Sequence, residues 1–221
     1  MAARNRFPPF RAAALVVAAA AISGSSGPAE GAPGPPAPPP VPPAALLPVG
    51  AIPGPPAPRA AFDVATALST LDPKEAGGDC ADVVHGRLLR AAATGQGFQT
   101  AVPGGQLSEL VARTPHPPGL AAWTAKLRQC ASVTLSDEDI PTVSTLTTGT
   151  APSVPGAETL SYQQVLTLPG QPAELPGLRL RTVAIAADDV LVVLRDAGAT
   201  DLDLDALAVA AWQHAASRLG R

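Results

Sequence analysis

Residues 178–195 read LRLRTVAIAADDVLVVLR, and this stretch decides which fold class the chain belongs to. Apolar residues recur at short intervals on both sides of Asp188-Asp189, which is typical of two strands joined by a tight turn. The alternation changes phase at Arg181 and Thr182. We therefore expect either a β-bulge there or a strand that is buried on both faces. The stretch predicts an antiparallel hairpin late in the chain.

Three segments upstream of this hairpin also alternate. They are SVTL at 132–135, TVSTLTTGT at 142–150 and TLSYQQVLTLP at 159–169. In the third segment Leu160 and Tyr162 share a face, and Gln164 interrupts it. The second segment is rich in hydroxyls, so O-glycosylation is an alternative to a plain strand and loop. Together with the hairpin, these segments predict a sheet of four to five strands.

Helical spacing of apolar residues predicts helices in the remaining parts of the domain. The predicted ranges are 62–71, 79–94, 107–114, 120–130 and 201–220. In the last helix the acidic residues precede the apolar stripe and Arg218 follows it, in agreement with the helix dipole. Helices followed by strands and a final helix indicate an α+β fold, with the helices packed mainly on one face of an antiparallel sheet.

The N-terminal residues have the composition of an export signal. Arg4, Arg6 and Arg11 precede an apolar run from Ala12 to Ile22, which is too short to span a bilayer but suits a signal-peptide core. Small residues follow at 23–27. We expect a signal peptide over 1–27 and a secreted or cell-envelope protein. An uncleaved anchor and a cytosolic alanine-rich helix are the alternatives.

About half of the 27 prolines lie between residues 28 and 59. Proline fixes φ and removes a hydrogen-bond donor, so this composition favours extended polyproline II. We expect residues 28–59 to be a disordered, proline-rich linker that acts as a spacer, with a recognition segment for an aromatic groove as the alternative. The globular domain is then expected over residues 60–221.

Cys80 and Cys130 are the two cysteines of the chain, and each lies on the apolar stripe of a predicted helix. An exported protein with an even number of cysteines usually oxidises them. We therefore expect one structural disulfide between Cys80 and Cys130. A redox centre would show C-x-x-C spacing, which this sequence lacks.

The sequence contains no recognisable catalytic, metal or cofactor motif. His85, one helical turn after Asp82, supplies half of a metal site at most, and we expect His116 and His214 to be loop and surface residues. The three acids in DLDLD at 201–205 resemble a calcium loop but lack its glycine and closing glutamate, so they are expected to begin a helix. The acidic run SDED at 136–139 is expected to be a solvated loop. A net charge of −3 makes a nucleic-acid partner unfavourable.

The order of elements resembles a known group of proteins. The residues that carry the likeness are LAAWTAKLRQC at 120–130, RTVAIAADDVLVVLRDAG at 181–198 and the alanine-rich final helix. They resemble secreted actinobacterial sensor-like domain proteins, which are distantly similar to the extracellular sensor domain of mycobacterial serine/threonine kinases. The resemblance implies a ligand cleft beside the sheet and no enzymatic activity. This chain departs from the kinase sensor in allowing one disulfide where that domain has two.

These observations rank three functions. The first is a non-catalytic secreted or cell-envelope module that binds a ligand in an apolar pocket between the sheet and the helix of Trp123. The second is a structural or protein-interaction component of the cell envelope, held out by the proline-rich stalk. The third is an unrecognised hydrolase. The expected partner is a cell-envelope ligand or protein, with membrane contact only through an uncleaved leader.

Overall fold

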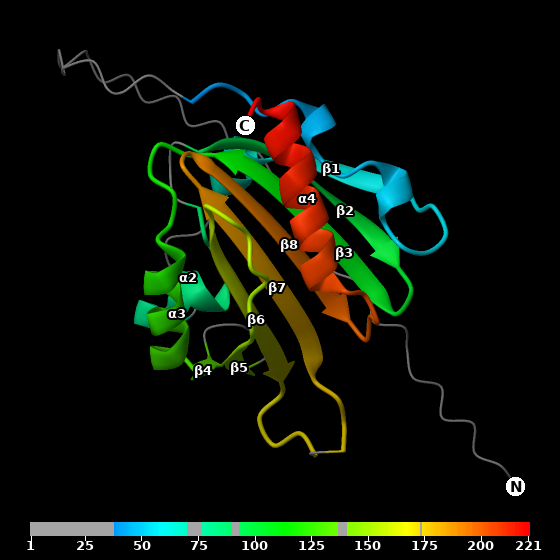
Figure 1. The fold of residues 1–221 in the computed structure, drawn as a ribbon. Helices are drawn as coiled ribbons and strands as arrows, with labels where there is room; N and C mark the ends of the chain where they lie inside the picture. The colour runs from blue at the N-terminus through cyan, green and yellow to red at the C-terminus, as the bar shows by residue number, and fades with distance from the viewer. Residues whose placement is uncertain (1–37, 70–76, 90–92, 137–140, 173) are drawn as a thin grey trace, which may run out of the picture. The chain divides into compact units, whose positions relative to one another are not determined.

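In the computed structural model, the described residues are 38–69, 77–89, 93–136, 141–172 and 174–221. They form one eight-stranded antiparallel sheet with the strand order β1-β2-β3-β8-β7-β6-β5-β4 (Figure 1). The expected antiparallel sheet and C-terminal helix are confirmed. The expected number of four to five strands is wrong. The predicted signal peptide over 1–27 lies outside the described residues.

The strands are β1 Arg59–Asp63, β2 Thr94–Val102, β3 Gly105–Arg113, β4 Ser132–Leu135, β5 Thr142–Thr148, β6 Glu158–Thr167, β7 Leu178–Ala187 and β8 Val190–Gly198. The helices are α1 Val64–Ser69, α2 Ala81–Val84, α3 Leu120–Gln129 and α4 Leu204–Arg218, with short 3₁₀ turns η1 Pro43–Ala45, η2 Val49–Ala51 and η3 Gly78–Cys80. The predicted helices over 120–130 and 201–220 are thus confirmed.

The predicted hairpin is β7–β8, and it lies in the middle of the sheet. Its register runs unbroken from Leu180 opposite Ala197 to Ala187 opposite Val190, so there is no bulge at Arg181 and Thr182. The other prediction, burial on both faces, is confirmed because four successive residues, 183 to 186, are at most 5% exposed. The phase change in the sequence therefore reports a strand covered on both sides.

The prediction of a helix over 107–114 is wrong, because these residues belong mainly to strand β3. The prediction that a helix ends at Gly95 and Gly97 is also wrong, because both glycines lie in strand β2. A Cβ at Gly95 would lie 2.4 Å from the Val111 carbonyl oxygen, and a Cβ at Gly97 would lie 2.1 Å from the Phe62 ring. These glycines therefore allow close packing within the sheet instead of ending a helix. In β3 the buried Glu109 interrupts the apolar alternation, so the strand period is not visible in the sequence.

Two other predicted helices are shorter than expected. The helix predicted over 79–94 is reduced to η3 and α2, and Gly86 follows with a positive φ of 65° that ends the helical turn. The helix predicted over 62–71 is confined to α1, since Phe62 belongs to β1. Residues 70–76 and 90–92 lie outside the described residues.

Helices cover both faces of the sheet, so the prediction that they pack mainly on one face is wrong. On one face α4 and η1 pack over the centre of the sheet, and on the other face α1, α2 and α3 form a second core (Figure 1). The first core contains Val183, Ile185, Val192, Leu194, Leu207, Ala208, Ala211 and Ala215. The second core contains Val83, Leu120, Leu127, Leu160, Tyr162, Ala184, Leu191 and Val193.

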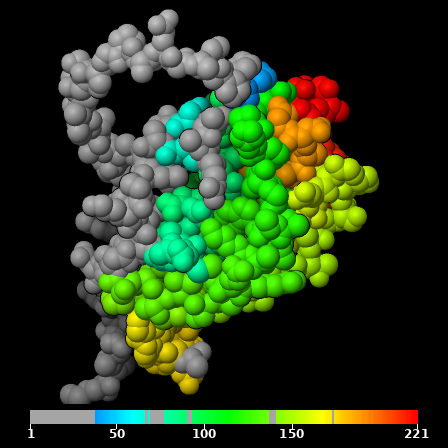
Figure 2. Space-filling view, turned by 90° about the vertical axis from the view of Figure 1, so that its left-hand side faces the viewer, coloured from blue at the N-terminus to red at the C-terminus, as the bar shows by residue number. Residues whose placement is uncertain are grey.

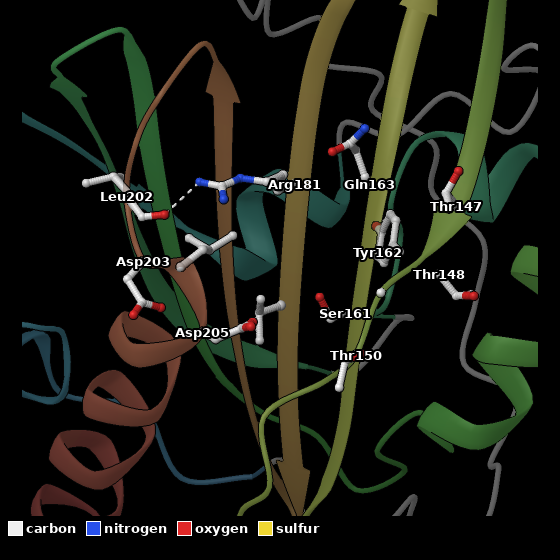
Figure 3. Close-up of a pocket in the computed structure, with 13 residues that line it drawn as sticks. Thr147, Thr148, Thr150, Ser161, Tyr162, Gln163, Arg181, Leu202, Asp203 and Asp205 are labelled. Carbon is white, nitrogen blue, oxygen red and sulfur yellow. Dashed lines mark hydrogen bonds between the residues drawn. The ribbon is translucent and has the colours of Figure 1, made fainter.

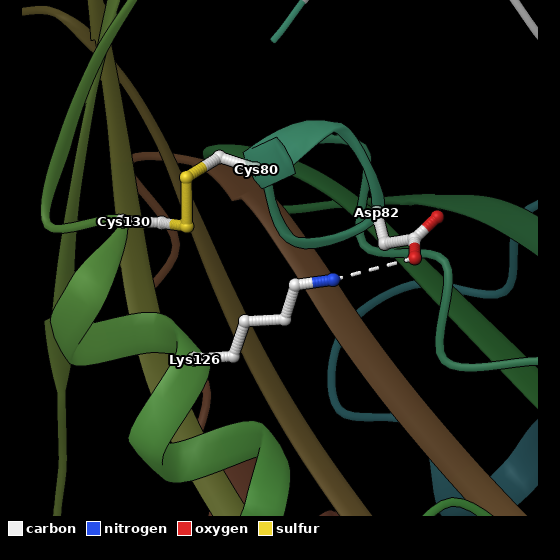
Figure 4. Close-up of a disulfide and its surroundings, with 4 residues drawn as sticks. All are labelled: Cys80, Asp82, Lys126 and Cys130. Atoms are coloured by element: carbon white, nitrogen blue, oxygen red, sulfur yellow. Dashed lines mark hydrogen bonds and ion pairs between the residues drawn. A yellow bond between two sulfur atoms is a disulfide. The ribbon is translucent and has the colours of Figure 1, made fainter. Parts of the chain in front are cut away.

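The predicted disulfide between Cys80 and Cys130 is confirmed, with a Cα–Cα distance of 5.7 Å (Figure 4). It joins the end of η3 to the residue that caps α3. Beside it the Lys126 ammonium lies 3.4 Å from the Asp82 carboxylate. The bridge thus holds the α2 segment against α3 on one face of the sheet.

Residues 38–58, which we call the strap, belong to the folded unit. The prediction of a disordered linker is therefore wrong for residues 38–59, while residues 28–37 lie outside the described part of the chain. In the strap Val41, Ala45 and Leu47 are at most 3% exposed, and they pack with residues of α4 and β3. The regular structure of this proline-rich segment consists of the 3₁₀ turns η1 and η2, and three of its apolar side chains join the core. Among the described residues no helix has the length and apolarity needed to cross a membrane.

Candidate functional site

A cleft of about 420 Å³ lies between the first turn of α4 and strands β5 and β6, with β7 as its floor (Figure 3). The residues that line it are mostly polar: Thr147, Thr148, Gly149, Thr150, Ser161, Tyr162, Gln163, Arg181, Val183, Leu202, Asp203, Leu204 and Asp205. Because α4 packs on β7 and β8, its first turn forms one side of the cleft, and β5 and β6 form the other.

Strand alternation explains why the wall of the cleft is polar. In β6 Leu160 and Tyr162 point to the core beneath α3, so Ser161 and Gln163 point to the opposite face, where α4 lies. Hydroxyl and amide groups therefore stand side by side along β5 and β6 (Figure 3). Each can both donate and accept a hydrogen bond.

Arg181 projects from β7 into the base of the cleft and is fixed there by several acceptors. Its Nε lies 3.1 and 3.0 Å from the two carboxylate oxygens of Asp196, and a terminal nitrogen donates to the Leu202 carbonyl at 2.9 Å. The hydrogen bond with Asp196 raises the pKa of Arg181. Because Asp196 is 1% exposed and lies beneath Arg181, the arginine charge is already balanced within the protein.

The opposite wall of the cleft is acidic. The Asp203 carboxylate caps α4 by accepting the Ala206 N–H at 3.0 Å. Burial and, after it, the charge of Asp203 raise the pKa of Asp205. Because the positive charge of Arg181 is balanced by the Asp196 carboxylate, Asp203 and Asp205 give the lining an excess of negative charge. The cleft therefore suits a neutral, hydroxyl-rich or amide-bearing ligand better than an anion.

The site differs from the expected pocket in place and in chemistry. Trp123 packs into the core beneath α3, on the face of the sheet opposite the cleft. The DLDLD segment does begin a helix, as predicted, but sequence reasoning missed that its acids line a cleft. Sequence reasoning also missed Ser161, Gln163 and Arg181. The hydroxyl-rich stretch at 142–150 was the available signal for one wall.

The three histidines do not converge on the cleft. The Nε2 atom of His214 lies 2.9 Å from the Ala44 carbonyl oxygen, so this imidazole contacts the strap. His116 lies in the loop before α3, and His85 caps the C-terminal end of α2. Among the described residues no group of three or more His, Cys, Asp or Glu side chains could hold a metal ion. Of SDED only Ser136 lies within the described residues.

No protein-family model matches the chain, and no curated protein is significantly similar to it. The crystal structure of an uncharacterized protein from Mycobacterium smegmatis is similar at 13% identity and a TM-score of 0.47, over 71% of this chain and 85% of that chain. Values this low do not establish a relationship between the two proteins.

Proposed function

We propose that this chain is a non-catalytic ligand-binding module of the sensor type that acts outside the cytoplasm, and that the cleft beside α4 is its binding site. The observation that carries the proposal is the cleft itself. The cleft has room for a ligand of a few sugar rings or a short peptide. The hydroxyl and amide groups of Thr147, Ser161 and Gln163 line it.

The fixed geometry of the cleft supports ligand binding. Arg181 is held by Asp196 and by the segment that leads into α4, so the floor of the cleft is preorganised before a ligand arrives. A hydrolase of the serine–histidine type needs an imidazole beside a hydroxyl, and the described contacts of His214 lead to the strap instead.

Export is part of the proposal. The apolar run after three arginines in the sequence motivates it, and the disulfide between Cys80 and Cys130 is the kind of bond that persists in oxidising compartments. The resemblance to sensor-like domains supports the same class of function.

Calorimetry on the purified chain tests the proposal. Neutral glycans and lipids of the cell envelope are first screened by thermal shift, and hits are titrated into the wild type, Gln163→Ala and Gln99→Ala. Gln99 is an exposed glutamine on β2 and serves as the matched control. Loss of one ligand hydrogen bond should weaken binding about three- to tenfold in Gln163→Ala and leave Gln99→Ala unchanged. The proposal fails if no compound stabilises the protein, or if both variants bind each hit like the wild type.

A further inference from the structure

The loop between β6 and β7, together with Leu178 at the start of β7, forms a tip that carries three exposed leucines. Leu168, Leu175 and Leu178 are 52%, 57% and 51% exposed, and they lie within eleven residues of each other in the sequence. The loop projects beyond the end of the sheet, at the lower edge of the molecule in both views (Figures 1 and 2). A projecting tip with three exposed leucines is atypical of a surface that meets only water.

Three backbone N–H groups of this loop are bonded within it. The Leu168 N–H donates to Gln171 Oε1 at 3.0 Å, and Gln171 Nε2 donates to the Leu175 carbonyl at 2.9 Å. The Gln171 and Leu175 N–H groups donate to loop carbonyls at 3.0 Å each. Three further positions, 169, 172 and 176, are prolines and have no N–H to satisfy. These internal bonds reduce the cost of moving the tip into a medium that offers no hydrogen bonds.

The charges of the loop also restrict its partner. Between residues 168 and 178 there is no Lys or Arg, and Glu174 is the single charged residue. Beyond the loop, Arg179 is held by carbonyl oxygens of Gly198 and Thr200. Electrostatic attraction to an anionic surface therefore cannot drive contact. Burial of the leucines can drive contact, because the removal of apolar surface from water lowers the free energy.

We propose that the β6–β7 tip inserts Leu168, Leu175 and Leu178 into the interfacial region of a lipid bilayer and so docks the domain on a membrane surface. A lipid surface fits better than a protein partner because the tip projects beyond the sheet, carries a single charged residue and has three of its backbone N–H groups bonded within the loop. A protein interface would use free donors and acceptors or a matching concave face.

Fluorescence on vesicles tests the proposal in the full chain. An environment-sensitive dye is attached at Leu175→Cys or, as the matched control, at Val49→Cys, where the native side chain is 48% exposed but lies outside the tip. Both native cysteines are paired, so the new thiol is the site of labelling. Both variants carry the same apolar N-terminal run, residues 12–22, so any binding of that run to vesicles is the same in the two proteins.

On phosphatidylcholine vesicles the dye at position 175 should shift to shorter wavelength, and the dye at position 49 should not. Replacing the three leucines by serine should lower the partition coefficient at least tenfold while leaving the melting temperature unchanged. The proposal is overturned if the dye at 175 stays in water when the protein is on vesicles. It is also overturned if the shift requires anionic phosphatidylglycerol and disappears in salt, or if it occurs without lipid as the protein concentration rises.

Discussion

The strap is held by a buried carboxylate, and this contact gives the sharpest stability prediction. Glu109 of β3 is 0% exposed, and its two oxygens accept the Leu47 N–H at 3.1 and 3.0 Å. Arg59 donates to the Leu47 carbonyl and stacks 4.0 Å from the centre of the Phe98 ring. Burial raises the pKa of Glu109 to about 7, although the Leu47 hydrogen bond and the charge of Arg59 oppose the shift.

The direction of the pH effect follows from this shift. Because the folded-state pKa lies above the unfolded value of 4.5, the folded protein holds the Glu109 proton more tightly than the unfolded chain does. The resulting stability is present below the unfolded pKa and is lost as pH rises through about 7. With these two values, the free energy of unfolding should fall by about 2–3 kcal/mol between about pH 5 and about pH 8.

Urea unfolding followed by tryptophan fluorescence at a series of pH values measures this loss. Glu109→Gln keeps an acceptor for the Leu47 N–H but cannot ionise, so the wild type should lose about 2–3 kcal/mol relative to this variant over the same interval. Taking the difference between the two profiles cancels the other titrating groups. Parallel profiles for the two proteins would refute the reasoning.

Three further predictions concern stability and are measured by denaturant unfolding. Replacing Cys80 and Cys130 by serine should lower the free energy of unfolding by about 4 kcal/mol, given their sequence separation of 50, and an unchanged midpoint would contradict a structural role. Ala45→Leu should cost about 1–3 kcal/mol by overpacking a strap residue that is 0% exposed, whereas a passive spacer would tolerate it. Gly86→Ala should lower the free energy of unfolding more than Gly156→Ala does. Both glycines have positive φ, but a Cβ at position 86 would lie 1.8 Å from an arginine nitrogen, whereas nothing lies within 4 Å of a Cβ at position 156. Equal losses for the two variants would contradict the packing around Gly86.

The sequence predicts those parts of the fold where pattern and packing agree. The β7–β8 hairpin, α3, α4 and the Cys80–Cys130 bridge follow from periodicity, turn residues and cysteine number. The missed hairpin β2–β3 contains glycines that serve close packing, and the buried Glu109 obscures its alternation. A single sequence does not distinguish a glycine that ends a helix from one, such as Gly97, whose missing side chain leaves room for the Phe62 ring.

The strap and the cleft were beyond sequence analysis for a different reason. The strap folds because Val41, Ala45 and Leu47 pack in one hydrophobic core with residues of α4 and β3, which are distant in the chain. The cleft depends on how far α4 extends across the sheet, so Ser161 and Gln163 become a wall only in the assembled fold. Both features arise from tertiary placement, and the hydroxyl-rich stretch at 142–150 is a local signal for one wall of the cleft only.

The central claim is that a ligand binds between α4 and strands β5 and β6. The most direct test is a ¹H–¹⁵N correlation spectrum of the chain during titration with the strongest glycan or lipid from the screen. The account predicts saturable shifts of the amides at 147–150, 161–163 and 203–206. Shifts confined to residues around Trp123 beneath α3, or to the strap, would contradict it.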